Sequence, residues 1–391
     1  MEYDSVQEKR LRQRLAEVMR RIRSTTPRLA ADENSAKCSE VWNGNLDGTA
    51  IQRVIIYLRS SGCSWAIGTP RDGEPNFKPG CFDCAHSVVG TTLGRKISSK
   101  SYVQQFTREF SRFDFSKFTT LCVYNEGSFF NDNELPRDAQ IAILNKISAN
   151  REIRVVVLES LPEFLTNDVL ANVSEILGSR RVEVGIGLES VDPVVRKLCV
   201  NKPYTLKDFE KAVLRAKNYV SVLAYVLLKP SFTTESEAVD DAIASTKYAF
   251  SKGANVVSIE PLNLSDYNLA GNLARANLYR VPWLWSVIEV AKATAHLGEL
   301  RIGGDQFAPT YRHQAQNCEK CSQRVKQQLN RFNETQSLDD ITWLECECKQ
   351  QWRIEMSAVS RPIIERIEDD LNQLSRELSR PGFLSTPILE Q

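Results

Sequence analysis

The sequence predicts an α/β protein built on a partial barrel of parallel strands. Between residues 53 and 258, a short apolar stretch, a polar loop and a helix-like stretch follow one another six times. The apolar stretches, such as "RVIIYLR" and "IRVVVL", are almost uninterrupted, which is typical of parallel strands buried on both faces. Several end in polar groups, as in "YNEGSFF" and "GLES". Because barrels build active sites at the carboxyl ends of their strands, these endings favour a partial (βα)6 TIM-like barrel over an open doubly wound sheet.

The apolar pattern places six strands and five intervening helices in this region. The strands are expected at 53–59, 119–124, 153–158, 182–188, 220–228 and 255–260. The helices are expected near 101–113, 135–149, 162–177, 207–218 and 235–252. Regular alternation of this kind implies right-handed crossovers and therefore a parallel sheet.

Further segments flank the barrel. Residues 7–23 predict a basic amphipathic helix, and "RPIIERIEDDLNQLSRELS" predicts a terminal helix with an apolar seam. Between them, a loop and helix over 279–297 and a further strand over 300–307 are expected to complete the barrel. We therefore expect three parts: an N-terminal helical extension (1–50), the partial barrel (51–310), and a C-terminal four-cysteine metal module with the terminal helix (311–391).

Composition and charge favour a cytoplasmic protein. The net charge of +1 and the isoelectric point near 7.5 exclude a global attraction to nucleic acid or membranes. The longest apolar run, near 220–228, is too short to span a bilayer, and no membrane partner is expected. The N-terminus lacks the apolar region of a signal peptide. Ten cysteines without an export signal are more typical of metal ligands than of disulfides.

Three cysteines follow the first predicted barrel strand. Cys63 is separated by seventeen residues from the pair Cys81 and Cys84 in "CFDC". A closed zinc site needs four ligands, and His86 could supply the fourth. Without it, three thiolates leave one coordination position open, as required of a cluster that binds a substrate directly. Spacing alone leaves both interpretations open.

A cysteine loop after the first strand of a partial barrel resembles the radical S-adenosylmethionine superfamily. The resemblance implies that Cys63, Cys81 and Cys84 bind three irons of a 4Fe–4S cluster, and that the fourth iron chelates the amino and carboxylate groups of S-adenosylmethionine. It also implies reductive cleavage of that cofactor to a 5′-deoxyadenosyl radical, which abstracts hydrogen from a substrate. The seventeen-residue gap departs from the usual C-x3-C-x2-C spacing, although the final two-residue gap is kept.

Two further motifs match cofactor-binding positions of that superfamily. "YNEGSFF" resembles the motif that holds the cofactor amino group, which implies a binding role for Asn125, Glu126, Gly127 and Ser128. A glycine turn capped by Ser128 is the structural alternative. "GIGLES" resembles the ribose-contacting position, with Glu189 or Ser190 directed toward the hydroxyls.

Five phrases together resemble the branch related to the Elongator catalytic subunit, which contains the radical subunit of archaeosine synthase. These are "GSFF", "ESLPEF", "GLES", "LLKPSFTTESEA" and "PWLWS". At the expected barrel mouth, Glu159, Lys229 and Glu260 are candidate catalytic residues, because each follows a strand. Lys229 and Glu260 could bind a substrate carboxylate and amine, or could pair with each other.

A second cysteine group lies in the C-terminal part. Cys318 and Cys321 form one close pair, and Cys346 and Cys348 form another. Two close pairs separated by a linker predict a four-thiolate metal site. We favour zinc, because all four positions would be filled by protein, and keep a second iron–sulfur cluster as the alternative.

The leading hypothesis is a radical S-adenosylmethionine enzyme that acts on a small amine or amino-acid-derived substrate in a biosynthetic pathway, with flavodoxin or ferredoxin as electron donor. Whether it is a lyase or an oxidoreductase stays open. The alternative substrate is a tRNA nucleobase that carries an amino-acid adduct. The cations of helix 7–23 could contact RNA or form a solvated face. A third hypothesis, from another class, is a non-catalytic RNA-binding scaffold stabilised by metal.

Overall fold

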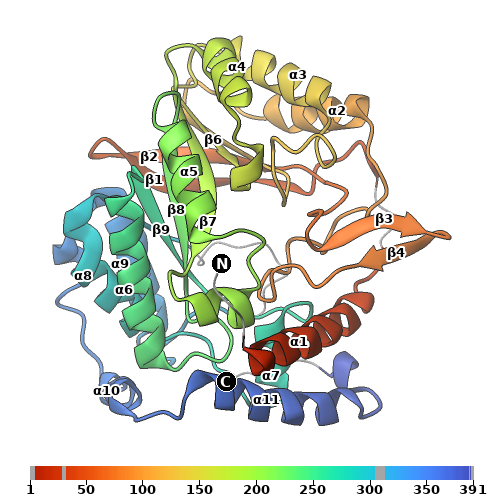
Figure 1. The fold of residues 1–391 in the computed structure, drawn as a ribbon. Coiled ribbons are helices and arrows are strands. Elements are labelled where there is room, and N and C mark those ends of the chain that lie inside the picture. Colours follow the sequence, from red (N-terminus) through yellow and green to blue (C-terminus); the bar gives the residue numbers. More distant parts are fainter. Residues whose placement is uncertain (1–4, 29–31, 304–312, 387, 389–391) are drawn as a thin grey trace.

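The centre of the molecule is a curled sheet of eight strands (Figure 1). The computed structural model describes residues 5–28, 32–303, 313–386 and 388. In sheet order the strands are β1 (Cys38–Leu46), β2 (Thr49–Tyr57), β5 (Thr120–Tyr124), β6 (Val155–Glu159), β7 (Arg181–Glu189), β8 (Ser221–Leu228), β9 (Val256–Pro261) and β10 (Glu299–Ile302). β1 is antiparallel to β2, and all other neighbours are parallel. The predicted partial barrel and its six parallel strands are confirmed.

Helices cover the convex face of the sheet and enclose the main core. They are α2 (Ser99–Phe110), α3 (Arg137–Ser148), α4 (Asn167–Leu177), α5 (Leu206–Ala216), α6 (Glu235–Ser251) and α8 (Leu284–Thr294). Alternate strand residues face opposite sides, so that Val54 and Ile56 join the outer core while Ile55 and Tyr57 join a smaller inner cluster. Among the described helices, none has the length and apolar character needed to cross a membrane.

Several elements were not predicted from the sequence. β1 lies inside the expected N-terminal extension but belongs to the sheet. A hairpin of β3 (Ile67–Arg71) and β4 (Glu74–Phe77) occupies most of the seventeen-residue gap between Cys63 and Cys81. Three helices were also missed: α7 (Leu269–Arg275), α9 (Ser322–Thr335) and α10 (Lys349–Ser357). Of the strand expected over 300–307, β10 is observed as far as Ile302, and positions 304–307 lie outside the described residues.

The two flanking helices predicted from the sequence pack together. α1 (Val6–Ser24) and α11 (Ile363–Leu378) lie side by side below the barrel (Figure 1). Their apolar faces share a core cluster with Phe82 of the cysteine loop. α1 is therefore a structural support of that loop, and its buried face is not available to a partner.

Helix α9 joins the two edges of the curled sheet. At the β10 edge, Asn333 accepts a hydrogen bond from the Ile302 N–H and donates one to the Ile302 carbonyl, both at 2.8 Å. At the β1 edge, the Asn45 amide donates to the Glu334 carbonyl at 2.6 Å. A side chain of α9 thus satisfies backbone groups of β10 that a closed barrel would satisfy with another strand, while a side chain of β1 bonds the backbone of the same helix.

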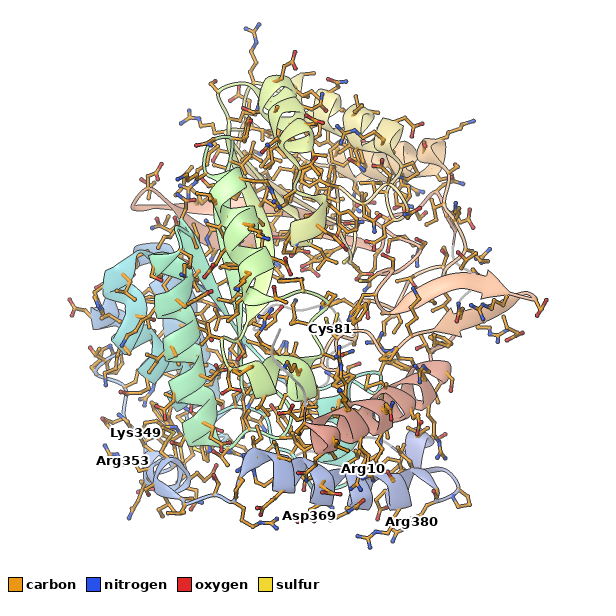
Figure 2. The ribbon with its side chains drawn as sticks, in the orientation of Figure 1. Arg10, Cys81, Lys349, Arg353, Asp369 and Arg380 are labelled. Carbon is orange, nitrogen blue, oxygen red and sulfur yellow. The ribbon has the colours of Figure 1, made fainter. Side chains whose placement is uncertain are left out.

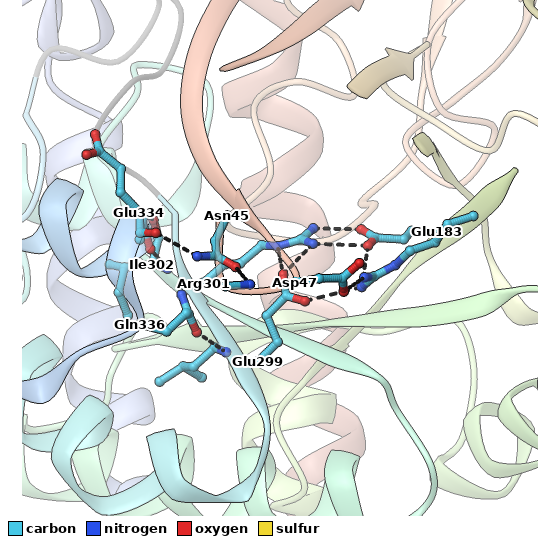
Figure 3. A network of polar contacts seen from close by, with 12 residues as sticks. Asn45, Asp47, Glu183, Glu299, Arg301, Ile302, Glu334 and Gln336 are labelled. Carbon is cyan, nitrogen blue, oxygen red and sulfur yellow. Dashed lines mark hydrogen bonds and ion pairs between the residues drawn. The ribbon is translucent and has the colours of Figure 1, made fainter. Parts of the chain in front are cut away.

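A buried charge network lies on the inner side of the same junction (Figure 3). Arg301 of β10 makes a two-pronged contact with Glu183 of β7, at 2.7 and 3.0 Å, and Arg181 contacts Glu183 at 2.8 Å. Burial opposes ionisation of Glu183, but the neighbouring arginines outweigh it and keep the pKa of this carboxyl below its usual value. The network links strands that are not neighbours in the sheet, and so fixes its curvature.

We predict that Asn333→Ala lowers the free energy of unfolding by about 1–3 kcal/mol, because it leaves the N–H and C=O of Ile302 without partners at a buried edge. Urea unfolding followed by circular dichroism measures this. Gln327→Ala, at an exposed position of the same helix, is the control and should be nearly neutral. Equal stability of the two variants would show that α9 does not support the sheet edge.

Candidate functional site

A cavity of about 270 Å³ lies inside the curl of the sheet and reaches the cysteine loop. Its wall includes Cys84 and His86 at one end and the carboxyl ends of β6 to β9 around the middle. Four acidic residues line it: Asp83, Glu159, Glu189 and Glu260. Arg53 and Arg301 line it from the inner face of the sheet. The cavity therefore brings the first cysteine group and the predicted strand-end carboxylates to one place.

The cysteine loop is held from below by two buried residues that sequence reasoning missed. Asp83, between two of the cysteines, accepts hydrogen bonds from the Ser231 N–H and hydroxyl, at 2.9 and 2.6 Å, and from the Ala270 N–H at 3.1 Å. Burial raises the pKa of Asp83 to about 6 despite these bonds. Arg23 of α1 donates to the carbonyls of Cys81 and Cys84, at 2.8 and 3.3 Å. An acidic residue inside an apolar C-x-x-C sequence was the one available signal for Asp83.

Glu134 ties the other cysteine to the predicted cofactor motif. Its carboxylate accepts from the N–H and hydroxyl of Ser64, at 2.8 and 2.5 Å, and from the Ser128 N–H at 2.6 Å. A side chain at Gly127 would collide with this carboxylate. Gly127 is therefore required by Glu134, whereas we expected it to permit backbone approach to a cofactor. Nothing in the sequence distinguishes Glu134 from a surface glutamate.

The motif after β5 carries two buried acceptor atoms without a hydrogen-bond partner among the described residues. They are Oδ1 of Asn125 and Oε2 of Glu126. The other carboxylate oxygen of Glu126 pairs with Lys37 and lies 3.4 Å from Nδ1 of His86. Glu126 has φ of +59°, a conformation uncommon for a residue with a side chain. Unpaired buried acceptors of this kind suit an ammonium group, which offers three donors.

The predicted serines have other partners. The Ser128 hydroxyl accepts from the Leu161 N–H at 3.0 Å, and the Ser190 hydroxyl donates to Asp241 at 2.8 Å. Ser190 is fully buried and does not line the cavity, whereas Glu189 does. Of the two residues predicted from "GIGLES", Glu189 therefore lines the cavity and Ser190 bonds Asp241 outside it, and the cofactor contact stays a prediction.

The three candidate catalytic residues do not all lie together. Glu159 and Glu260 line the cavity, but Lys229 does not. Lys229 is buried, with its Nζ 2.6 Å from Glu235 and its carbonyl bonded to the Tyr279 hydroxyl. The expectation that Lys229 faces the barrel mouth beside Glu260 is thus wrong. Lys229, directly after β8, has a φ of +64°, and its side chain pairs with Glu235 instead.

The two cavity carboxyls resist ionisation. Burial raises the pKa of Glu159 to about 7, and the charges of Glu126 and Glu189 add to the shift, while a 2.8 Å hydrogen bond from Tyr225 opposes it. Burial likewise raises the pKa of Glu260 to about 7, opposed by the Ser258 hydroxyl at 2.6 Å. Gly185 makes room for the Tyr225 ring, since a side chain there would meet it at 2.6 Å. Carboxyls in this state are available to bind a cation or exchange a proton near neutral pH.

The second cysteine group forms a compact four-sulfur site. Cys318 Sγ lies 3.7 Å from Cys321 Sγ and 3.6 Å from Cys346 Sγ, and Cys321 Sγ lies 3.6 Å from Cys348 Sγ. A tetrahedral ion with metal–sulfur bonds of about 2.3 Å places its sulfurs about 3.8 Å apart. A four-iron cluster holds its sulfurs farther apart, because each binds a different iron. The spacing therefore fits a single tetrahedral ion.

The first cysteine group is less compact than the second. Within the described part of the chain, Cys318, Cys321, Cys346 and Cys348 are the one group whose ligand atoms all lie within 4.8 Å of one another. Cys63, Cys81 and Cys84 do not form such a compact group, and Cys84 lines the cavity. Their thiols, with the unpaired acceptors of Asn125 and Glu126, are compatible with a cluster that carries a bound amino acid.

Comparison with known proteins gives three relatives. An uncharacterised protein of Methanocaldococcus jannaschii is 30% identical over 80% of this chain and 84% of its own length. The archaeosine synthase subunit beta of Methanosarcina acetivorans is 29% identical over 80% and 88%. The archaeosine synthase subunit beta of Thermococcus kodakarensis is 30% identical over 59% and 72%. No family model matches the chain.

Two solved structures share parts of the fold at low identity. The Elp3 protein of Methanocaldococcus infernus aligns with a TM-score of 0.43 and 16% identity, over 61% of this chain and 59% of its own. Methylornithine synthase aligns with a TM-score of 0.44 and 10% identity, over 76% and 72%. The sequence relatives, and not these distant folds, identify the family.

We predict that Glu159→Gln removes a pH-dependent loss of stability. A folded-state pKa of about 7, above the ordinary 4.5, means that the folded protein holds this proton more tightly, so wild-type stability falls as pH rises from 4.5 to 7. Relative to wild type, the variant should gain roughly 2–3 kcal/mol between pH 4.5 and pH 8. Urea unfolding at both pH values measures this. Glu163→Gln, which changes an exposed glutamate nearby, is the control, and its free energy of unfolding should change with pH as that of wild type does. If Glu159→Gln also showed the pH dependence of wild type, the raised pKa of Glu159 would be contradicted.

Proposed function

The chain belongs to the family of archaeosine synthase beta subunits, and from this premise we propose that it is a radical S-adenosylmethionine enzyme with a 4Fe–4S cluster on Cys63, Cys81 and Cys84. One observation supports the proposal: Cys84 lines a cavity of about 270 Å³ whose wall also carries Asp83, Glu159, Glu189 and Glu260. When bound, cluster and cofactor together supply a 5′-deoxyadenosyl radical that takes a hydrogen atom from the substrate. Whether the overall reaction is a lyase or an oxidoreductase type follows from the substrate.

Four acidic or amide side chains would bind the cofactor or hold the segments that bind it. Asn125 and Glu126 would accept hydrogen bonds from the cofactor ammonium with their unpaired oxygens. Glu189, which lines the cavity, would accept hydrogen bonds from the ribose hydroxyls. Glu134 would keep the Cys63 and Ser128 segments in register, so that thiolates and acceptors are fixed before the cofactor arrives.

For the substrate we propose a small amine or amino-acid-derived molecule. Glu159 and Glu260 line the part of the cavity beyond Cys84, and an entering ammonium would replace the proton that burial keeps on them. The volume suits a group of amino-acid size. Tyr225 would orient the Glu159 carboxylate toward it.

A tRNA nucleobase bearing an amino-acid adduct is the second candidate, because two relatives are named archaeosine synthase subunit beta. In that case the amino-acid arm would enter the cavity and the nucleoside would stay at its mouth. The word subunit in those names also favours a protein partner for this chain. A low-potential donor of the flavodoxin or ferredoxin class would supply the electron.

The class of enzyme is tested by anaerobic reconstitution with iron and sulfide. We expect wild type to form 5′-deoxyadenosine from S-adenosylmethionine after dithionite reduction, and Cys84→Ala to lose both the cluster absorbance and this product. Cys199→Ala, a buried cysteine outside both groups, is the control and should retain both. A Cys84→Ala protein that still makes 5′-deoxyadenosine would refute the assignment.

The substrate class is tested with the same reconstituted enzyme. Glu260→Gln should lower the binding of a responsive amine by roughly tenfold, equivalent to about 1.4 kcal/mol, because it removes the carboxylate charge. Candidate amines are screened by stimulation of 5′-deoxyadenosine formation. A salt-dependent gel shift of tRNA would favour the second candidate, and its absence at low salt would count against it.

We further propose that Cys318, Cys321, Cys346 and Cys348 bind one zinc ion. The sulfur spacing supports a single ion, and four protein ligands leave no open position. α9 begins directly after Cys321, so the ion would fix the start of the helix that bridges the sheet edges.

We predict one zinc per chain in wild type. Cys346→Ser should lose zinc and lower the melting temperature, because metal binding and local folding are coupled in such sites. The spectrum of the first cluster should be preserved in this variant. Twice the iron of a single cluster, without zinc, would establish the alternative of a second cluster.

A further inference from the structure

A buried arginine from the N-terminal helix lies against the first cysteine group. Arg23 is fully buried near the end of α1 and reaches across to the loop, where Nη2 contacts the carbonyls of Cys81 and Cys84. Figure 2 shows Cys81 directly above α1. The helix thus delivers a positive charge to the centre of the molecule, about sixty residues away in sequence from the cysteines that it meets.

Among the described residues, Nε and Nη1 of the guanidinium have no hydrogen-bond partner. Burial lowers the pKa of Arg23, and the groups whose negative charge opposes this shift are Cys84, Cys81 and Cys63. A buried guanidinium with two unused nitrogens is costly unless a negative group offsets it. The three cysteines are therefore the groups whose negative charge can offset the positive charge of Arg23.

The loop is shaped to admit this side chain. Gly80 has φ of +58°, and a side chain there would collide with Nη1 of Arg23. Asn201 holds the Gly80 carbonyl at 2.7 Å, which keeps this glycine in place. The seat of the guanidinium is therefore built by residues outside the cysteine triad, independently of the carbonyl contacts.

We propose that Arg23 is a positioning residue that raises the reduction potential of the cluster by placing a fixed positive charge beside it. The proposal rests on the proposed function, since it requires the cluster on the three cysteines. Reduction transfers one electron from an external donor to a site that three thiolates already make negative. A neighbouring cation stabilises the added negative charge. It therefore lowers the free energy of the reduced cluster more than that of the oxidised cluster, and the reduction potential rises.

The experiment is a redox titration of the reconstituted protein without S-adenosylmethionine, followed by electron paramagnetic resonance, with iron content measured in parallel. In Arg23→Met, which removes the charge at similar volume, the midpoint potential should shift to more negative values at equal iron content. Arg23→Lys should stay close to wild type. Arg20→Met, at an exposed position on the same helix, is the matched control and should not shift.

The other outcomes are also decisive. An unchanged potential in an iron-loaded Arg23→Met protein would overturn the proposal, because a purely structural clamp affects loading and not potential. If Arg23→Met binds no iron, Arg23→Gln replaces it. If neither neutral variant holds iron, Arg23 acts on cluster loading as a clamp, and the proposal is overturned. A wild-type protein without a cluster would refute the proposed function itself.

Discussion

A sheet that curls without closing leaves two edges with unpaired backbone groups, and α9 contacts both. Asn333 supplies an acceptor and a donor to Ile302 at the β10 edge, and Asn45 of β1 reaches the end of the same helix. One wall of the cavity also comes from α9, through Asn330 and Asn333. Because one pair of the four-cysteine group, Cys318 and Cys321, immediately precedes this helix and the other pair, Cys346 and Cys348, follows it, the C-terminal segment contributes to the wall of the cavity.

The cysteine loop is likewise held by polar contacts between residues that lie far apart in the sequence. Glu134 fixes the Cys63 side, Asp83 fixes the pair side, and Arg23 supports the pair from α1. These anchors explain how the loop tolerates seventeen residues between its first two cysteines. The β3–β4 hairpin accommodates the additional length, and the polar anchors hold the two ends of the loop.

The sequence predicted the elements that depend on local apolar patterns, and missed those that depend on long-range polar contacts. The six parallel strands are buried on both faces, so their apolar runs were unambiguous. β1, "CSEVWNGNL", mixes polar and apolar residues, because much of it is not packed in the core, and it carries no such signal. Glu159 and Glu260 were placed correctly by the rule for strand ends. Lys229 obeys the same rule in sequence, but Glu235 binds it, and no periodicity reveals such a pairing. Glu134 and Arg23 are likewise recognisable only by their partners.

Charge balance inside the curl connects these observations. Arg53 and Arg301 lie on the inner face of the sheet, but Arg301 is committed to Glu183 and so cannot neutralise the carboxylates at the strand ends. Burial raises the pKa of Glu159 and Glu260 to about 7, whereas the arginines keep the pKa of Glu183 low, and Tyr225 holds Glu159 in place. The carboxyls at the strand ends therefore exchange protons near neutral pH, and the ammonium group of the proposed amine substrate would find its acceptors there.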